Sequence, residues 1–103
     1  MASSEPVPTL VIYRPKPGAE PALEALIRKH IPTLRGLGLL GTGQSAAFRA
    51  EDKRAGRAAY VEIFDWKDDR ASAVAHQTPE VMAIWEPMEP LLEGLEIRQL
   101  QPL

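Results

Sequence analysis

The stretch Ala58-Ala59-Tyr60-Val61-Glu62-Ile63-Phe64-Asp65-Trp66 is the clearest β-strand in this sequence, because β-branched and aromatic residues dominate it. Successive side chains of a strand point to opposite faces. One face therefore carries Tyr60, Glu62, Phe64 and Trp66, and the other carries Ala59, Val61, Ile63 and Asp65. Since both faces hold apolar side chains, we expect the strand to lie centrally in a sheet.

Shorter β-rich runs lie on both sides of this strand. They predict further strands over residues 9–14, 43–50 and 95–100, the second of them weak. Residues 51–56 are polar and of hairpin length, so they predict the connection into the strand at 58–66.

Two helical regions separate the strands. The first is predicted from near Glu20 or Pro21, because its apolar residues recur at the spacing of one helical stripe. These are Leu23, Leu26, Ile27, His30, Ile31 and Leu34. Pro32 falls inside the stripe and predicts a kink or the end of the regular helix. The second region opens near Asp68 or Asp69, with a break at Thr78-Pro79-Glu80, which has the pattern of a new N-cap followed by proline.

The resulting order, β-α-β-β-α-β, is the ferredoxin-like α+β arrangement. Because crossover connections are right-handed, it predicts one four-stranded antiparallel sheet with both helices on one face. A chain of 103 residues is expected to form one domain. We place that domain at residues 9–103 and expect residues 1–8, which are small, polar or proline, to be a flexible N-terminus.

Two helices on one face leave the other face of the sheet open. The predicted first strand has no polar face, with Leu10 and Ile12 on one side and Val11 and Tyr13 on the other. A large exposed apolar sheet face would be a liability in a monomer. We therefore expect a homodimer in which the open faces of two subunits pack together.

Composition narrows the class of partner. The net charge of −2 argues against nucleic acid or an anionic membrane surface, and the basic run at 53–57 is interleaved with acidic neighbours, as in a solvated loop. The absence of cysteine excludes disulfides and thiolate metal sites. No apolar run is long enough to span a membrane, and the amino terminus does not resemble a secretory signal. A cytoplasmic location is expected.

Three local features add to the order of elements: the aromatic-Asp-Trp-Lys-Asp run at 64–68, a histidine ten residues after Trp66, and the His-x-x-Pro-Glu-Val pattern from His76. With these features the chain resembles the dimeric α/β-barrel superfamily, and most of all its antibiotic-biosynthesis-monooxygenase-like branch, over residues 9–100. The resemblance implies a dimeric α/β barrel with a site between the sheet and the second helix of each subunit. That family includes cofactor-independent oxygenases of phenolic or quinol-like compounds, isomerases, and many members with no known activity.

His76 and Glu62 are the candidate catalytic residues. The imidazole of His76 would accept a proton from a phenol-like or enol-like group, or else simply fix the break before Pro79. Glu62 would act as a base if it is desolvated, or form a structural ion pair with Arg49 or Arg98. His30, in the first helical stripe, is more typical of a hydrogen-bonded residue at the edge of a core.

The candidate substrate-binding residues are aromatic: Tyr13, Tyr60, Phe64, Trp66 and Trp85. Such residues form the wall of a small-molecule pocket or pack as core, and the two roles are compatible.

Two functions remain open on this basis. One is a cofactor-independent monooxygenase of a phenolic or quinol-like compound, and the other is a non-catalytic ligand-binding or stress-related dimer with the same pocket. Both take a small aromatic or apolar ligand, and neither uses a cofactor. No metal is expected, because the two histidines lie 46 positions apart without neighbouring ligands at metal spacing.

Overall fold

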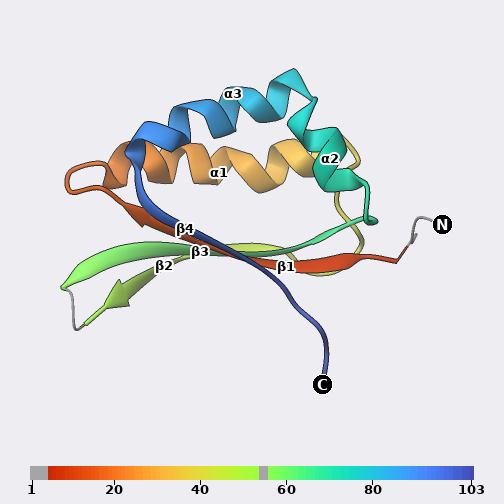
Figure 1. The fold of residues 1–103 in the computed structure, drawn as a ribbon, viewed down its shortest axis with the longest axis horizontal. Helices are drawn as coiled ribbons and strands as arrows, with labels where there is room; N and C mark the ends of the chain where they lie inside the picture. Colours follow the sequence, from red (N-terminus) through yellow and green to blue (C-terminus); the bar gives the residue numbers. More distant parts are fainter. Residues whose placement is uncertain (1–4, 54–55) are drawn as a thin grey trace.

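The computed structural model of the chain describes residues 5–53 and 56–103. Its elements, in chain order, are β1 (Val7–Pro15), α1 (Glu20–Gly36), β2 (Ala46–Asp52), β3 (Arg57–Trp66), α2 (Ala71–His76), α3 (Pro79–Met88), the 3₁₀ turn η1 (Glu89–Leu91) and β4 (Leu92–Gln99). The four strands form one antiparallel sheet in the order β2-β3-β1-β4. The helices lie on one side of the sheet, and the other side is open (Figure 1). The predicted ferredoxin-like fold is confirmed.

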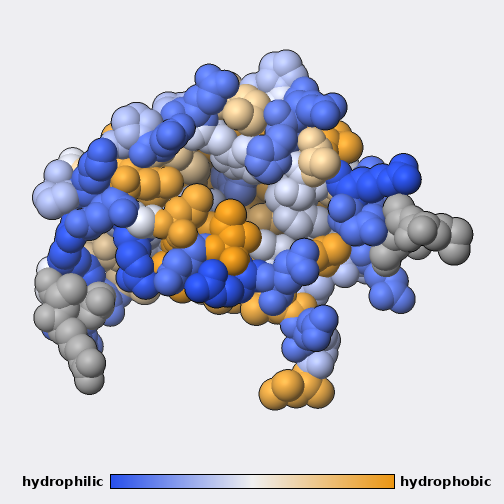
Figure 2. All heavy atoms as spheres, viewed as in Figure 1, coloured by the Kyte–Doolittle hydropathy of each residue, from blue (hydrophilic) through white to orange (hydrophobic). Residues whose placement is uncertain are grey.

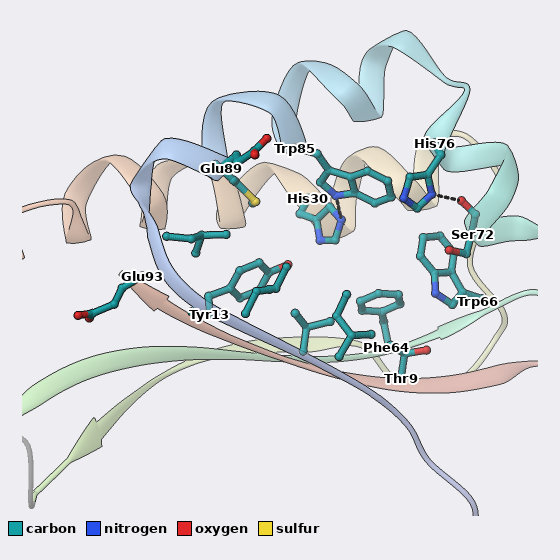
Figure 3. Close-up of a pocket in the computed structure, with 16 residues that line it drawn as sticks. Thr9, Tyr13, His30, Phe64, Trp66, Ser72, His76, Trp85, Glu89 and Glu93 are labelled. Atoms are coloured by element: carbon teal, nitrogen blue, oxygen red, sulfur yellow. Dashed lines mark hydrogen bonds between the residues drawn. The ribbon is translucent and has the colours of Figure 1, made fainter. Parts of the chain in front are cut away.

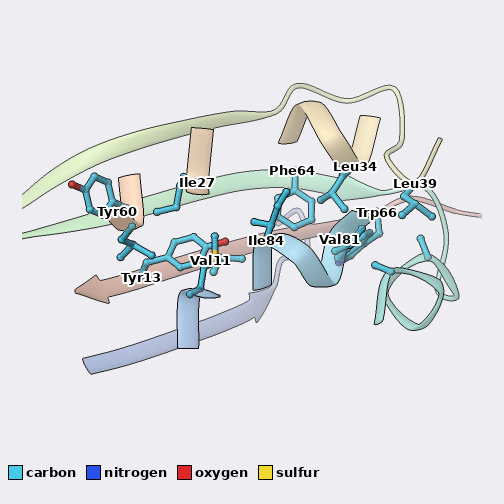
Figure 4. Close-up of a cluster of buried hydrophobic side chains, with 14 residues drawn as sticks. Val11, Tyr13, Ile27, Leu34, Leu39, Tyr60, Phe64, Trp66, Val81 and Ile84 are labelled. Carbon is cyan, nitrogen blue, oxygen red and sulfur yellow. The ribbon is translucent and has the colours of Figure 1, made fainter. Parts of the chain in front are cut away.

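Register decides which side chains lie under the helices. In the central pair, Val11 is opposite Glu62 and Thr9 is opposite Phe64. Residues that face each other across antiparallel strands point to the same side of the sheet. The core therefore forms where this side meets the apolar stripes of α1 and α3 (Figure 4). The open side carries Leu10, Ile12, Phe48, Val61 and Ile63.

Helix α1 buries one stripe against the sheet and α3. Its buried residues, Leu23, Ile27, His30 and Leu34, follow the predicted helical spacing. The expectation that Pro32 would end the regular helix is wrong, because α1 continues through it to Gly36. Pro32 leaves the carbonyl of Arg28 without an intrahelical donor. Both residues are exposed, so this carbonyl lies on the face of the helix where water is available.

The second helical region is broken as predicted. Helix α2 ends at His76, Thr78 has extended backbone angles, and α3 starts at Pro79. The carbonyl of Thr78 accepts hydrogen bonds from the N–H groups of Val81 and Met82, so it begins the new helix. The break turns α2 across the end of the sheet and lets α3 run back over it (Figure 1).

Strand boundaries differ from the predicted ones by up to three residues. β1 begins at Val7, which pairs with Trp66, so the last two residues of the segment expected to be flexible belong to the sheet. β2 covers Ala46–Asp52 in place of 43–50. Gly43 lies in a bend before the strand, close to the Asp65 carboxylate. β4 begins at Leu92, before the predicted 95–100. Residues 1–4 and the loop residues Arg54 and Ala55 lie outside the described part of the chain.

None of the helices in residues 5–53 and 56–103 is long and apolar enough to cross a bilayer.

Replacing Pro32 by alanine is expected to raise the free energy of unfolding by about 1–2 kcal/mol, because alanine restores an N–H donor to the Arg28 carbonyl. Urea unfolding followed by circular dichroism measures the change. Lys29→Ala, on the same exposed side of α1, is the control and should stay within about 0.5 kcal/mol. A Pro32→Ala protein no more stable than the parent would show that the proline does not strain the helix.

Candidate functional site

A cleft of about 530 Å³ opens on the helix-covered side of the sheet. Helix α3 and the turn η1 lie above it, and β1, β3 and β4 lie below it (Figure 3). Apolar side chains gather in the hollow between the helices and the sheet (Figure 2). The volume lies within the usual range of small-molecule pockets.

The edge strand β4 forms the open side of this cleft. Leu95 is opposite Tyr13 and Ile97 is opposite Val11, so both point to the helix-covered side. Even so, Leu95 is 48% exposed and Ile97 is 59% exposed, because the helices do not extend over the edge strand. The cleft is thus the space that the helical layer leaves uncovered on a four-stranded sheet.

A carboxylate is buried directly beneath the cleft. Glu62 has no exposed surface. Its two oxygens lie 2.9 and 3.0 Å from Nδ1 of His30, and the hydroxyl of Tyr13 donates a short hydrogen bond to Oε1. A buried carboxylate is tolerated only where donors replace water. Here both donors come from residues that also line the cleft.

The hydrogen-bond directions around His30 define its protonation. The indole N–H of Trp85 donates to Nε2 of His30 over 2.8 Å, so Nε2 carries no hydrogen. The other nitrogen, Nδ1, therefore carries the hydrogen and donates it to Glu62. The result is a directed chain from Trp85 through a neutral His30 to an ionised Glu62.

The pKa of Tyr13 is raised strongly above its ordinary value of 10.0. The largest cause is burial, followed by the negative charge of Glu62 and the hydrogen bond that Tyr13 donates to it. Deprotonation would place two negative charges next to each other without water, so Tyr13 stays a neutral donor.

His76 lies at the other end of the cleft. Its Nδ1 is 2.8 Å from the carbonyl oxygen of Ser72, one helical turn earlier, and its ring packs on Trp85 with centroids 4.7 Å apart (Figure 3). If Nδ1 donates to that carbonyl, the neutral ring presents Nε2 as an acceptor. His76 is an exposed residue, and among residues 5–53 and 56–103 no group hydrogen-bonds to its Nε2.

The rim of the cleft is acidic. Glu89 and Glu93 line it, and Glu93 forms an ion pair with Arg57 over 2.6 Å. In the described part of the chain, no lysine or arginine is among the lining residues. An anionic ligand would therefore find no fixed positive charge inside the cleft.

Five of the seven predicted site residues line this cleft: Tyr13, Phe64, Trp66, His76 and Trp85. Glu62 lies behind Tyr13 and His30 and does not line it. Tyr60, which was predicted to bind substrate, does not line this cleft. It lies near the other end of β3, where its hydroxyl donates a hydrogen bond to the carbonyl of Glu20 over 3.3 Å.

The predicted ion pair of Glu62 with Arg49 or Arg98 is wrong. Arg49 is opposite Tyr60, two pairs further along the sheet from Glu62, and bonds to Glu24 of α1. Arg98 is opposite Leu10 and so points to the open side. The partner of Glu62 is His30. The helical stripe predicted that His30 lies on the buried face of α1, but it did not indicate which residue His30 would contact.

No cluster of three or more metal-ligating side chains occurs among residues 5–53 and 56–103. The cleft offers aromatic rings, aliphatic side chains and isolated polar atoms, so its lining fits an organic molecule.

The sequence matches no model of a protein family and no curated protein. Solved structures do match. The Pseudomonas aeruginosa protein PA3566 is 26% identical, covers 97% of this chain and 96% of its own, and has a TM-score of 0.73. SnoaB from Streptomyces nogalater, described as a cofactor-independent oxygenase, is 18% identical over 96% of this chain and 94% of its own, with a TM-score of 0.72. A solved antibiotic biosynthesis monooxygenase is 16% identical over 94% and 98%, with a TM-score of 0.73.

These likenesses confirm the predicted resemblance at the level of the fold. The chain has the fold of antibiotic-biosynthesis-monooxygenase-like proteins over nearly its whole length.

The raised pKa of Tyr13 predicts a loss of stability in alkali. The unfolded chain releases this proton near pH 10, whereas the folded chain retains it. The contribution of protonated Tyr13 to the stability of the folded chain is therefore complete below about pH 10 and is lost as the pH rises further. Circular dichroism and tyrosinate absorbance, recorded together, should show Tyr13 ionising only as the protein unfolds. Tyr13→Phe should flatten the decline. Ionisation of both tyrosines near pH 10 in a folded protein would contradict this account.

Proposed function

We propose that this protein binds a small hydroxylated aromatic molecule in the cleft between α3 and β4, and that it is a cofactor-independent monooxygenase of that molecule. The observation that carries the proposal is His76 at the exposed end of an aromatic cleft, where its Nδ1 lies 2.8 Å from the Ser72 carbonyl, its ring packs on Trp85 and its Nε2 has no partner among the described residues.

The walls of the cleft suit a planar ligand. Phe64 and Trp66 pack edge to face, with centroids 5.1 Å apart, and Trp85 faces them from α3. Apolar walls bind an aromatic ring by removing it from water, and a few polar atoms orient it. A ligand hydroxyl that donates to Nε2 of His76 would use the one free ring nitrogen of the site.

In this mechanism His76 acts as the general base. The ligand O–H bond breaks, its proton passes to Nε2, and the electron pair remains on the ligand oxygen. The electron-rich ligand then reacts with molecular oxygen and supplies the electrons itself, so that one oxygen atom enters the product and the other leaves as water. SnoaB, which has the same fold, is described as a cofactor-independent oxygenase, and this supports the reaction class.

In this proposal Glu62 is not the general base. It lies behind two cleft residues, and its oxygens already accept hydrogen bonds from Tyr13 and His30. It therefore supports the cleft from below without contacting the ligand.

A second function is favoured by the charge of the cleft. The lining includes Glu89 and Glu93 but no lysine or arginine, so a deprotonated ligand would gain little electrostatic stabilisation. This observation favours a non-catalytic protein that holds a neutral aromatic molecule.

Oxygen uptake with a panel of quinols and polyphenols separates the two functions. For a monooxygenase, His76→Phe should lower the rate by at least about 100-fold, because phenylalanine retains the packing on Trp85 and removes the base. Ligand affinity, measured by tryptophan fluorescence, should change much less. Gln77→Ala, beside His76 but outside the cleft, is the matched control. Binding of the panel without any oxygen uptake would favour the carrier.

We also infer that two copies of the chain pack through the open side of the sheet. Phe48 is 55% exposed and Ile63 is 39% exposed there. Val61 is opposite Phe48 and Ile12, and Leu10 is opposite Ile63, so the apolar residues adjoin one another across β2, β3 and β1. A continuous apolar sheet face of this kind is typical of an interface. A second copy supplies a matching face by two-fold symmetry.

Light scattering should return twice the mass of one chain at micromolar concentration. Ile63→Asp should give the monomer, because the carboxylate would be buried without a partner in the dimer yet is exposed in a single chain. Gln77→Asp introduces the same charge on another exposed surface and should leave the dimer intact. A monomeric parent protein would overturn the inference.

A further inference from the structure

We propose that His30 is a positioning residue, which holds the indole of Trp85 as the wall of the cleft, and that Glu62 sets the tautomer of His30 that makes this possible. The inference rests on the proposed function in so far as Trp85 is a wall of the ligand site. It assigns a role in that site to a histidine that the sequence alone indicated as structural.

The first step is the hydrogen-bond capacity of the three groups. An indole N–H only donates, and an ionised carboxylate only accepts. A neutral imidazole placed between them has one donor and one acceptor, and only one tautomer satisfies both neighbours. Glu62 takes the hydrogen on Nδ1 and thereby leaves Nε2 as the acceptor for Trp85.

Burial makes this choice of tautomer matter. His30 is 2% exposed and Glu62 is fully buried, so water cannot replace a lost partner. In the opposite tautomer, two N–H groups would face each other at Trp85, and Nδ1 would face a carboxylate without a hydrogen. Unsatisfied buried polar groups are costly, so the carboxylate excludes that state.

The hydrogen bond to His30 fixes a side chain that packing alone holds on only part of its surface. Trp85 is half-buried, and its ring lies between two imidazoles, with centroids 5.9 Å from His30 and 4.7 Å from His76. The first imidazole anchors the indole, and the second packs on it (Figure 3). The packing of His76 on Trp85 thus adjoins the hydrogen bond that Trp85 donates to His30.

The chain also joins three elements that are distant in sequence. Glu62 belongs to β3, His30 to α1 and Trp85 to α3. Tyr13 of β1 donates a second hydrogen bond to Glu62 and takes no part in the hydrogen bond between Trp85 and His30. Removal of the Tyr13 hydroxyl is therefore a control that perturbs the same carboxylate and spares the proposed function of His30.

Nuclear magnetic resonance tests the tautomer directly. In ¹⁵N-labelled protein, a scalar coupling across the hydrogen bond should connect Nε1 of Trp85 with Nε2 of His30, and the ¹⁵N shifts should identify the Nδ1–H tautomer. Glu62→Gln offers His30 an N–H donor as well, so the coupling should weaken or disappear. Tyr13→Phe should retain it.

A double-mutant cycle tests the effect on the ligand site, with 1-naphthol as the probe. Glu62→Gln should weaken binding about tenfold in the parent protein but less than about twofold in Trp85→Phe, which has no indole N–H to position. A purely structural role of Glu62 would give the same loss in both backgrounds. Unfolding in urea shows whether each variant is folded.

The outcomes separate the two proposals. An Nε2–H tautomer in the parent protein, or equal losses in the two backgrounds, would overturn the positioning role while leaving ligand binding intact. Failure of 1-naphthol and of the quinol panel to bind the parent protein would overturn the proposed function, and the role of His30 in ligand binding with it.

Discussion

A buried carboxylate that must be hydrogen-bonded is the constraint around which this structure is organised. Glu62 has no access to water, and its carboxyl oxygens are hydrogen-bonded by Tyr13 and His30. Because those donors come from β1 and α1, the carboxylate ties the sheet to the helical layer. Removal of one donor from such a group costs more than the bond itself contributes, because the buried carboxyl oxygen is left without a partner.

The cleft is a consequence of how few helices the fold has. Two helical segments cover β1 and β3, and the edge strand β4 keeps Leu95 and Ile97 exposed on the same side. The space above the edge strand is a cleft bordered by Trp85 of α3 and His76 of α2. Other chains share this fold at 16–26% identity, yet a fold of this kind hosts many functions, so its chemistry depends on the residues that border this space.

The order of elements was predictable, and so was much of the lining. The alternation in β3 placed Phe64 and Trp66 on one face, and the pattern at Thr78-Pro79 predicted the break that directs α3 back over the sheet. Tyr60 shares that face of β3 and was predicted in the site for this reason. Tyr60 nevertheless lies outside the cleft. Alternation predicts the face of a strand on which a side chain lies, but it does not predict which part of that face borders a cleft.

The sequence by itself determined the faces of the strands, the buried stripe of α1 and the break between α2 and α3, because these depend on local periodicity and on the backbone limits of proline. Only the tertiary structure decided that Glu62 would meet His30 in place of Arg49 or Arg98, and that Trp85 would donate to that same histidine. Hydrogen-bond partners from distant elements depend on sheet register and on how helices dock, to within a fraction of an ångström. Local sequence carries no direct signal for either.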